Sequence, residues 1–182
     1  MTVLFADVRG FTALAQQLAP EALVRQVNQF FQVTTETLLR HDACIDKLAG
    51  DQIMAVFGAP VVRPDHADQA VAAARAIQRD LGRLSAALGV TPRLEVGIGI
   101  NTGEAVVGNV GSTYVKDFTA MGETVNLAAH LQQAAGPGEI LVTQATLNAL
   151  AAPVDGGVPR LVPVKGLPAP LTVHVLSAPG PA

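Results

Sequence analysis

Residues 46–58 read DKLAGDQIMAVFG, and this stretch decides the fold because two apolar segments flank the Gly50-Asp51 pair. A glycine–aspartate pair between apolar segments is typical of a β-hairpin turn. Glycine suits such a turn because it adopts backbone conformations that other residues resist. The sequence therefore predicts a strand before Gly50, a tight turn, and a buried strand over 53–57.

Two charged residues in this hairpin, Lys47 and Asp51, need an explanation. Burying such charges costs several kcal/mol unless they are compensated. One interpretation is a solvated hairpin tip. The other is a site where the carboxylate of Asp51 holds a metal ion and Lys47 contacts a polar ligand.

The N-terminal segment offers a second candidate carboxylate. Residues 2–6 form a short apolar run that predicts a buried strand, and Asp7-Val8-Arg9-Gly10-Phe11-Thr12 follows directly. An acidic residue at a strand end, before a glycine turn and a helix start, is typical of a metal–phosphate site. The alternative is that Asp7 caps the helix, and the segment alone favours neither.

The other elements follow from periodicity and from the positions of Gly and Pro. Helices are expected over 20–41, 70–88, 123–134 and 144–150, and strands over 94–100, 105–110, 140–142, 161–164 and 171–176. We interpret 94–100 and 105–110 as one hairpin followed by a polar excursion, 112–117. Its five glycines suggest close approach of another backbone, such as a partner chain.

This order of elements predicts an α+β fold. We expect a ferredoxin-like βαββαβ core sandwich, with one sheet covered by helices on one face and with added C-terminal strands and a helix. A length of 182 residues suits one domain, here 1–177. Residues 178–182 read as a linker remnant, and both chain ends suggest a module from a longer protein.

Composition excludes several classes. The net charge of −3 argues against a nucleic-acid surface, and a single cysteine, Cys44, excludes a disulfide framework or thiolate cluster. Neither a signal peptide nor an apolar run of membrane-spanning length occurs in the sequence, which predicts a soluble, cytoplasmic chain without a membrane segment.

Several motifs occur in an order that resembles class III nucleotidyl cyclase catalytic domains. They are residues 3–12, 46–51, 98–104, 107–112 and 122–128, together with Val164-Lys165-Gly166. Any one of them is a weak signal, whereas so many in order are specific. The resemblance implies conversion of a nucleoside triphosphate to a 3′,5′-cyclic monophosphate and pyrophosphate, with two divalent ions, Mg or Mn.

The resemblance also implies roles for individual residues. Asp7 and Asp51 match the metal-binding aspartates, and the backbone oxygen of Val8 joins the metal shell. Amides around Gly10, Phe11 and Thr12 would cradle phosphate.

Base choice rests on Lys47 and Thr119. An ammonium only donates, which suits adenine N1, whereas the threonine hydroxyl can accept from a 6-amino group or donate to a 6-oxo group. This pair resembles the subclass related to bicarbonate-responsive soluble adenylyl cyclases.

Three further positions complete the inferred site. Asn126 matches the residue that orients the ribose, and Lys165 matches the lysine that reaches the terminal phosphates. His130 stands where relatives have an arginine. Histidine lacks the bidentate fork, and losing such a donor costs about 10²–10³-fold in rate. Activity is therefore expected to be weak, acid-favoured or absent.

Family members work as head-to-tail dimers, which implies a homodimer with two equivalent sites. The leading hypothesis is an adenylate cyclase that binds ATP, within a longer signalling protein. The alternatives are a catalytically weak or inactive nucleotide-binding sensor or dimerisation module, and a cyclase for another nucleotide. An RNA-binding module is disfavoured by the net charge and the few aromatic residues.

Overall fold

The computed structural model describes residues 1–88, 94–154 and 157–176, so the expected linker at 178–182 lies outside the described residues. The elements are β1 (Thr2–Val8), α1 (Phe11–Gln17), α2 (Pro20–Arg40), β2 (Cys44–Ala49), β3 (Gln52–Phe57), α3 (His66–Leu88), β4 (Val96–Thr102), β5 (Val106–Gly111), β6 (Lys116–Met121), α4 (Glu123–Ala134), β7 (Ile140–Thr143), α5 (Gln144–Asn148), β8 (Val158–Val162) and β9 (Leu171–Leu176).

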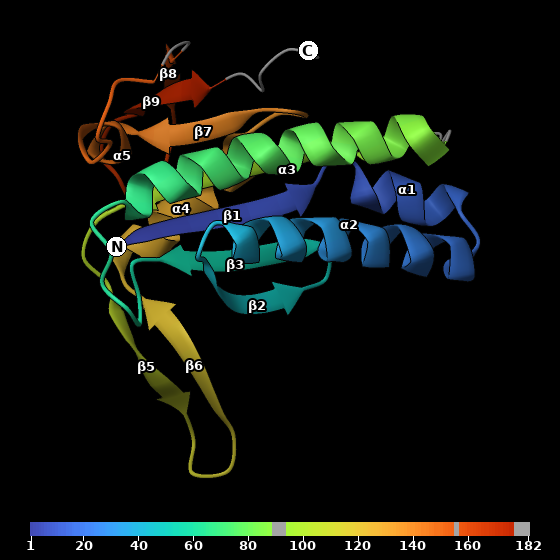
Figure 1. The fold of residues 1–182 in the computed structure, drawn as a ribbon, viewed down its shortest axis with the longest axis horizontal. Coiled ribbons are helices and arrows are strands. Elements are labelled where there is room, and N and C mark those ends of the chain that lie inside the picture. The colour runs from blue at the N-terminus through green and yellow to red at the C-terminus, as the bar shows by residue number, and fades with distance from the viewer. Residues whose placement is uncertain (89–93, 155–156, 177–182) are drawn as a thin grey trace.

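The main sheet has the order β2-β3-β1-β4-β7-β9-β8 (Figure 1). Its first four strands are antiparallel neighbours, with β1 between β3 and β4. This order, with α2 and α3 as the crossovers, is the ferredoxin-like βαββαβ core that the sequence predicted. The added strands β7, β9 and β8 extend the sheet beyond β4, and α5 follows β7, which confirms the predicted α+β class.

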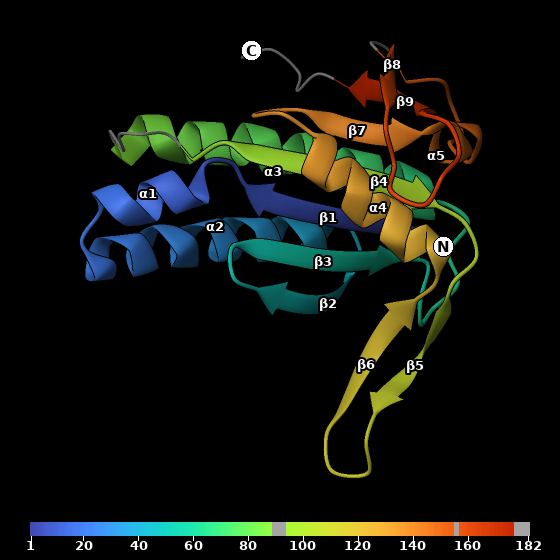
Figure 2. The same ribbon diagram turned by 180° about the vertical axis from the view of Figure 1, so that it is seen from behind.

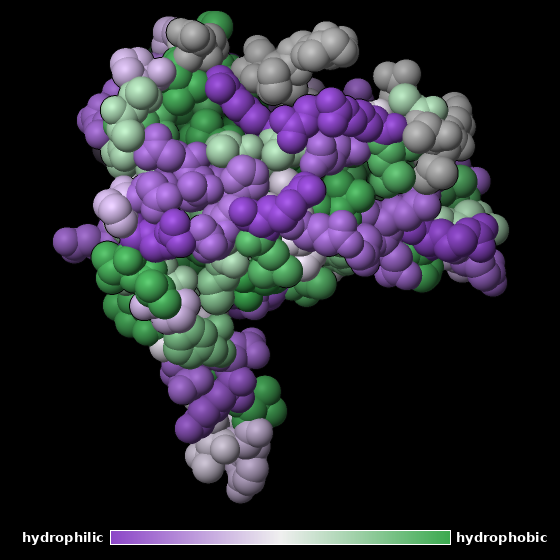
Figure 3. All heavy atoms as spheres, viewed as in Figure 1, coloured by the Kyte–Doolittle hydropathy of each residue, from purple (hydrophilic) through white to green (hydrophobic). Residues whose placement is uncertain are grey.

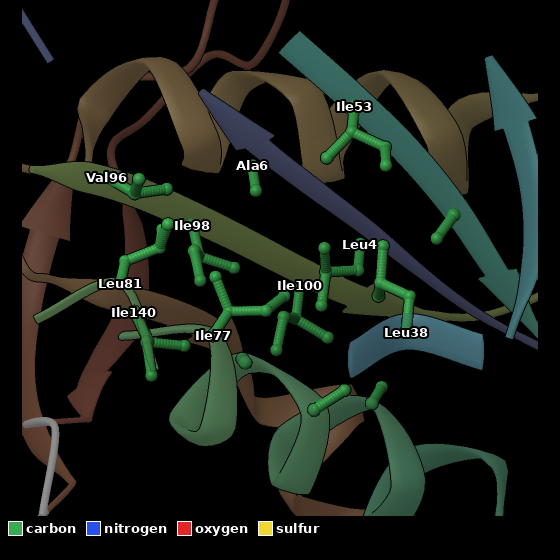
Figure 4. Packing of buried hydrophobic residues seen from close by; sticks show 14 of the residues in the cluster. Leu4, Ala6, Leu38, Ile53, Ile77, Leu81, Val96, Ile98, Ile100 and Ile140 are labelled. Carbon is green, nitrogen blue, oxygen red and sulfur yellow. The ribbon is translucent and has the colours of Figure 1, made fainter. Parts of the chain in front are cut away.

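Helices α2 and α3 cover one face of this sheet. Alternate residues of the central strands point to that face, so Leu4, Ile98 and Ile100 pack against Ile77 of α3 and are fully buried (Figure 4). The outer faces of α2 and α3 are largely hydrophilic (Figure 3). No helix in the described residues is long and apolar enough to cross a bilayer.

The expectation of helices on only one face is wrong. Helix α4 crosses the opposite face of the sheet (Figure 2), where Val3 and Phe5 of β1 pack near Val125 and Ala128. The physical reason is visible in β1, whose apolar residues are consecutive. A strand of that kind is buried on both faces.

The predicted pairing of 94–100 with 105–110 is also wrong. Strand β4 pairs with β1 and β7, whereas β5 pairs with β6 in a separate two-stranded sheet. This arm, residues 106–121, projects from the body (Figures 1 and 2). The sequence did not predict strand β6, because it begins with the polar residues Lys116 and Asp117. In addition, β8 begins at Val158, three residues before the predicted start.

Glycines in β4 allow α4 to lie close to the sheet. A Cβ on Gly99 would lie 2.2 Å from the backbone nitrogen of Gln132 and 2.4 Å from the oxygen of Ala128. Gly97 and Gly103 likewise face this chain's own residues, Arg9 and Thr124. Close approach of a backbone therefore explains Gly99, but the backbone belongs to this chain and not to a partner.

Gly99→Ala is expected to destabilise the fold by about 3 kcal/mol, because the atoms it would meet are backbone and α4 must shift. Gly82→Ala is the matched control, since Gly82 lies in α3 with no atom near its Cβ position. There alanine should stabilise the protein by up to about 1 kcal/mol. Urea unfolding measures both variants, and equal midpoints would contradict this account of helix packing.

Candidate functional site

Asp7 and Asp51 come together at the end of β1. Asp7 is the penultimate residue of β1, and Asp51 lies in the β2–β3 turn, after Gly50 in a left-handed conformation (φ 62°). The backbone N–H of Val8 donates to the backbone oxygen of Asp51 at 3.3 Å. This contact fastens the turn to the strand end, so the two carboxyl groups share one locality.

Electrostatics make this pair unusual. Burial first, and then the charge of Asp51, raise the pKa of Asp7 from 3.8 to about 6, although Arg9 opposes the shift. Near neutral pH, two carboxylates are thus held together at a cost in repulsion. Hard divalent cations such as Mg²⁺ bind carboxylate oxygens and remove that repulsion. The residues present therefore fit a divalent metal.

Two side chains orient Asp7. Nη2 of Arg9 donates to Oδ2 of Asp7 at 3.0 Å, and Nε2 of Gln132 donates to the same oxygen at 2.9 Å. Gln132 accepts in turn from Nε2 of Gln52 at 2.9 Å. Sequence reasoning missed Gln132, whose signal was a glutamine on the apolar face of α4. A buried amide of this kind needs partners.

Gly10, Phe11 and Thr12 lie where α1 begins, directly after β1. Gly10 is the N-cap residue in a left-handed conformation (φ 69°), and no side chain caps this helix. The alternative in which Asp7 caps α1 is therefore wrong. The backbone N–H groups of the first turn have no partner within a helix, so they are suited to an anion beside the two carboxylates.

Lys47, Thr119 and Asn126 line one cavity of about 440 Å³, although they come from β2, β6 and α4. The Lys47 side chain is 44% exposed, whereas Thr119 is buried. Phe5 and Met54 of the central sheet also line this cavity, and both are buried. The cavity therefore combines an apolar floor with a few polar groups, which is typical of small-molecule sites.

Asn126, His130 and Lys165 line a neighbouring cavity of about 350 Å³. Asn126 borders both cavities, which makes them adjacent. Asp7 and Asp51 border neither. Helix α4 separates the two groups, because Gln132 faces Asp7 while Asn126 and His130 lie on the more exposed side of α4. In the described residues, the carboxylate pair and the two cavities therefore lie in different places on one chain.

Residues 1–177 match the profile of the adenylate and guanylate cyclase catalytic domain. Adenylate cyclase 1 of Rhizobium meliloti (strain 1021) is 34% identical over 134 residues, or 72% of this chain and 20% of that protein. The terminal-differentiation specific adenylate cyclase of Dictyostelium discoideum is 32% identical over 164 residues, which cover 89% of this chain and 8% of that protein. The chain therefore spans a fifth or less of either relative.

Solved structures agree. The guanylyl cyclase Cya2 superposes with a TM-score of 0.88 at 36% identity, covering 99% of this chain and 93% of that one. The adenylyl cyclase CyaB of P. aeruginosa superposes with a TM-score of 0.87 at 34% identity, covering 98% of this chain and 94% of that one. These relatives differ in their nucleotide, so they leave the base unassigned. Because the family profile matches residues 1–177 of the 182, the chain belongs to the adenylate and guanylate cyclase catalytic domain family.

Proposed function

We propose that this domain is an adenylate cyclase that converts ATP to 3′,5′-cyclic AMP and pyrophosphate at the interface of a homodimer. The observation that carries the proposal is the cavity lined by Lys47, Thr119 and Asn126. Its lysine is a donor, which suits the acceptor N1 of adenine and mismatches the N1–H of guanine.

Asp7, Asp51 and the backbone oxygen of Val8 are the groups that would hold two divalent ions, Mg or Mn. Such ions supply positive charge to the phosphates and favour loss of the proton from the ribose 3′-hydroxyl. Arg9 and Gln132 keep the Asp7 carboxylate in one orientation. The backbone N–H groups of residues 10–12 follow β1 directly and would donate hydrogen bonds to phosphate oxygens.

The residues that line the two cavities would have complementary tasks. Asn126 borders both cavities, so it can orient a ribose between a base and its phosphates. Lys165 would contact the terminal phosphates. His130, which lines the same cavity as Lys165, would face the α-phosphate in the transition state.

The separation of these groups supports a homodimer. A complete site needs the carboxylates of one protomer and the two cavities of the other. The β5–β6 arm supports this assembly, because it exposes large apolar side chains; these are Val106 (74%), Tyr114 (95%), Val115 (72%), Phe118 (50%) and Met121 (52%). An exposed apolar patch of this kind marks an interaction surface.

Assays of cyclic product from ATP, GTP, CTP and UTP with Mn²⁺, at pH 6 and pH 7.5, test the proposal. We expect cyclic AMP to be the main product at both pH values. A folded protein that forms another cyclic nucleotide preferentially would contradict the adenine assignment. Absence of every cyclic product would contradict catalysis.

The second candidate function is nucleotide sensing without turnover. His130 favours it, because an imidazole cannot provide the bidentate fork of an arginine. Calorimetry separates the two functions. Binding of ATP with Mn²⁺ but without product would favour the sensor.

A further inference from the structure

Asp46 has a buried carboxylate, and none of the proposed roles involves it. Its side chain is only 4% exposed. The register between β2 and β3 shifts between Ile45 and Lys47, so Asp46 is the extra residue of a β-bulge. Bulges redirect a side chain, and this one brings Asp46 into contact with β6, a strand of the other sheet.

Three donors surround the Asp46 carboxylate. The hydroxyl of Thr119 donates to Oδ1 at 2.8 Å, and the backbone N–H of Ala120 donates to Oδ2 at 2.9 Å. Nζ of Lys47 lies 3.4 Å from Oδ1. A hydroxyl, an amide and an ammonium all suit an ionised carboxylate, which can only accept hydrogen bonds.

The contact to Thr119 fixes the direction of its hydroxyl. A threonine hydroxyl has one proton, and here the proton points to Asp46. The other acceptor within reach, the carbonyl of Ala120, is farther away at 3.4 Å. The groups left to face a ligand in the cavity are the lone pairs of the threonine oxygen. Thr119 is therefore an acceptor towards the cavity.

We propose that Asp46 determines base specificity by holding Thr119 as an acceptor, so that Lys47 and Thr119 present a donor and an acceptor side by side. Adenine offers the matching acceptor N1 and donor 6-amino group. Guanine offers the reverse at both positions. The inference rests on the proposed function, since the base must enter this cavity. Asp46 acts through Thr119 and Lys47 and is a positioning residue.

Asp46→Asn tests the inference. Asparagine has one acceptor oxygen, which the buried N–H of Ala120 needs, so its amide would donate to Thr119. The threonine proton is then free for the 6-oxo group of guanine. We expect the affinity ratio of α,β-methylene ATP to α,β-methylene GTP, measured by calorimetry with Mn²⁺, to fall about tenfold or more. The ratio of kcat/KM for ATP and GTP should fall in parallel.

Asp80→Asn is the matched control. Asp80 also accepts from a threonine and a cation, Thr37 and Arg40, but on the α2–α3 side of the molecule. Its loss should leave the ATP/GTP ratio unchanged. Thr119→Val is the second variant, in case Asp46→Asn does not fold. Replacing the hydroxyl by a methyl group should weaken binding of the ATP analogue about tenfold and leave binding of the GTP analogue unchanged or tighter.

The outcomes separate this inference from the proposed function. An unchanged ratio in folded Asp46→Asn would overturn it, as would a loss of GTP rather than ATP affinity in Thr119→Val. In either case a wild-type preference for ATP would leave the proposed function standing. If the wild-type protein binds neither analogue, the proposed function fails and takes the inference with it.

Discussion

Replacing Asp7 or Asp51 by asparagine is expected to lower cyclic AMP formation by about 10³-fold or more, because each loses a charged oxygen ligand for a divalent ion. Charge stabilisation of several kcal/mol by a metal corresponds to such a factor. The measurement is turnover of Mn-ATP by each purified variant. Activity within tenfold of the wild type in either variant would contradict the role of this pair.

The stability of the metal-free protein provides the control, because Asp7→Asn should raise the stability while it lowers the activity. The pKa of Asp7 in the folded state, about 6, exceeds its ordinary value of 3.8. Between these pH values the folded state holds a proton that the unfolded state has lost. Wild-type stability should therefore fall as pH rises from about 4 to about 6.

Asp7→Asn removes that titration. At pH 7, without metal, the variant should be more stable than the wild type by about 1 kcal/mol, or about 2–4 °C in melting temperature. Mn²⁺ should raise the melting temperature of the wild type and have little effect on the variant. A variant that is less stable than the wild type at pH 7 would contradict the electrostatic account of Asp7.

Asp51→Asn, combined with a second variant, Asn126→Ala, tests the dimer. Asp51→Asn disrupts the carboxylate pair, and Asn126→Ala disrupts the residues that line the two cavities. Each variant alone should therefore be inactive. After mixing and exchange, half of the dimers contain both variants and one intact site. About a quarter of the wild-type activity should return. No recovery in a mixture shown to exchange would contradict a site shared between protomers.

His130→Arg is expected to raise kcat by about 10²–10³-fold with little change in KM. A guanidinium offers a planar fork to phosphate oxygens, and a donor that acts on developing charge contributes about this factor. An interaction made only in the transition state changes kcat rather than ground-state binding. The measurement is steady-state turnover of Mn-ATP by wild type and variant at pH 7.5.

His130→Lys is the matched control, because lysine supplies the charge without the fork. Its gain should be clearly smaller than that of arginine. If the wild type shows no turnover and His130→Arg creates it, the native domain is the nucleotide sensor. An arginine variant with unchanged or lower kcat would show that this position does not limit the reaction.

Local patterns predicted much of the fold. The bounds of α4, the start of α2 at Pro20 and the hairpin turn at Gly50 are confirmed. These signals depend on neighbours a few residues away, such as a proline at the first helical position. The strand predicted over 105–110 is present as β5, but its predicted pairing with β4 was wrong, because strands with similar apolar patterns compete for the same edges and no local signal ranks those pairings.

The sequence by itself determined which chemical groups are candidates for a site: two carboxylates, a lysine and threonine pair, an asparagine and a histidine. Only the tertiary structure decided what those groups contact. Gln132 reaches Asp7 across 125 positions, and Asp46 reaches Thr119 across 73. Such contacts depend on strand order, on a β-bulge and on the closeness of α4 to Gly99, and these are properties of the folded chain as a whole.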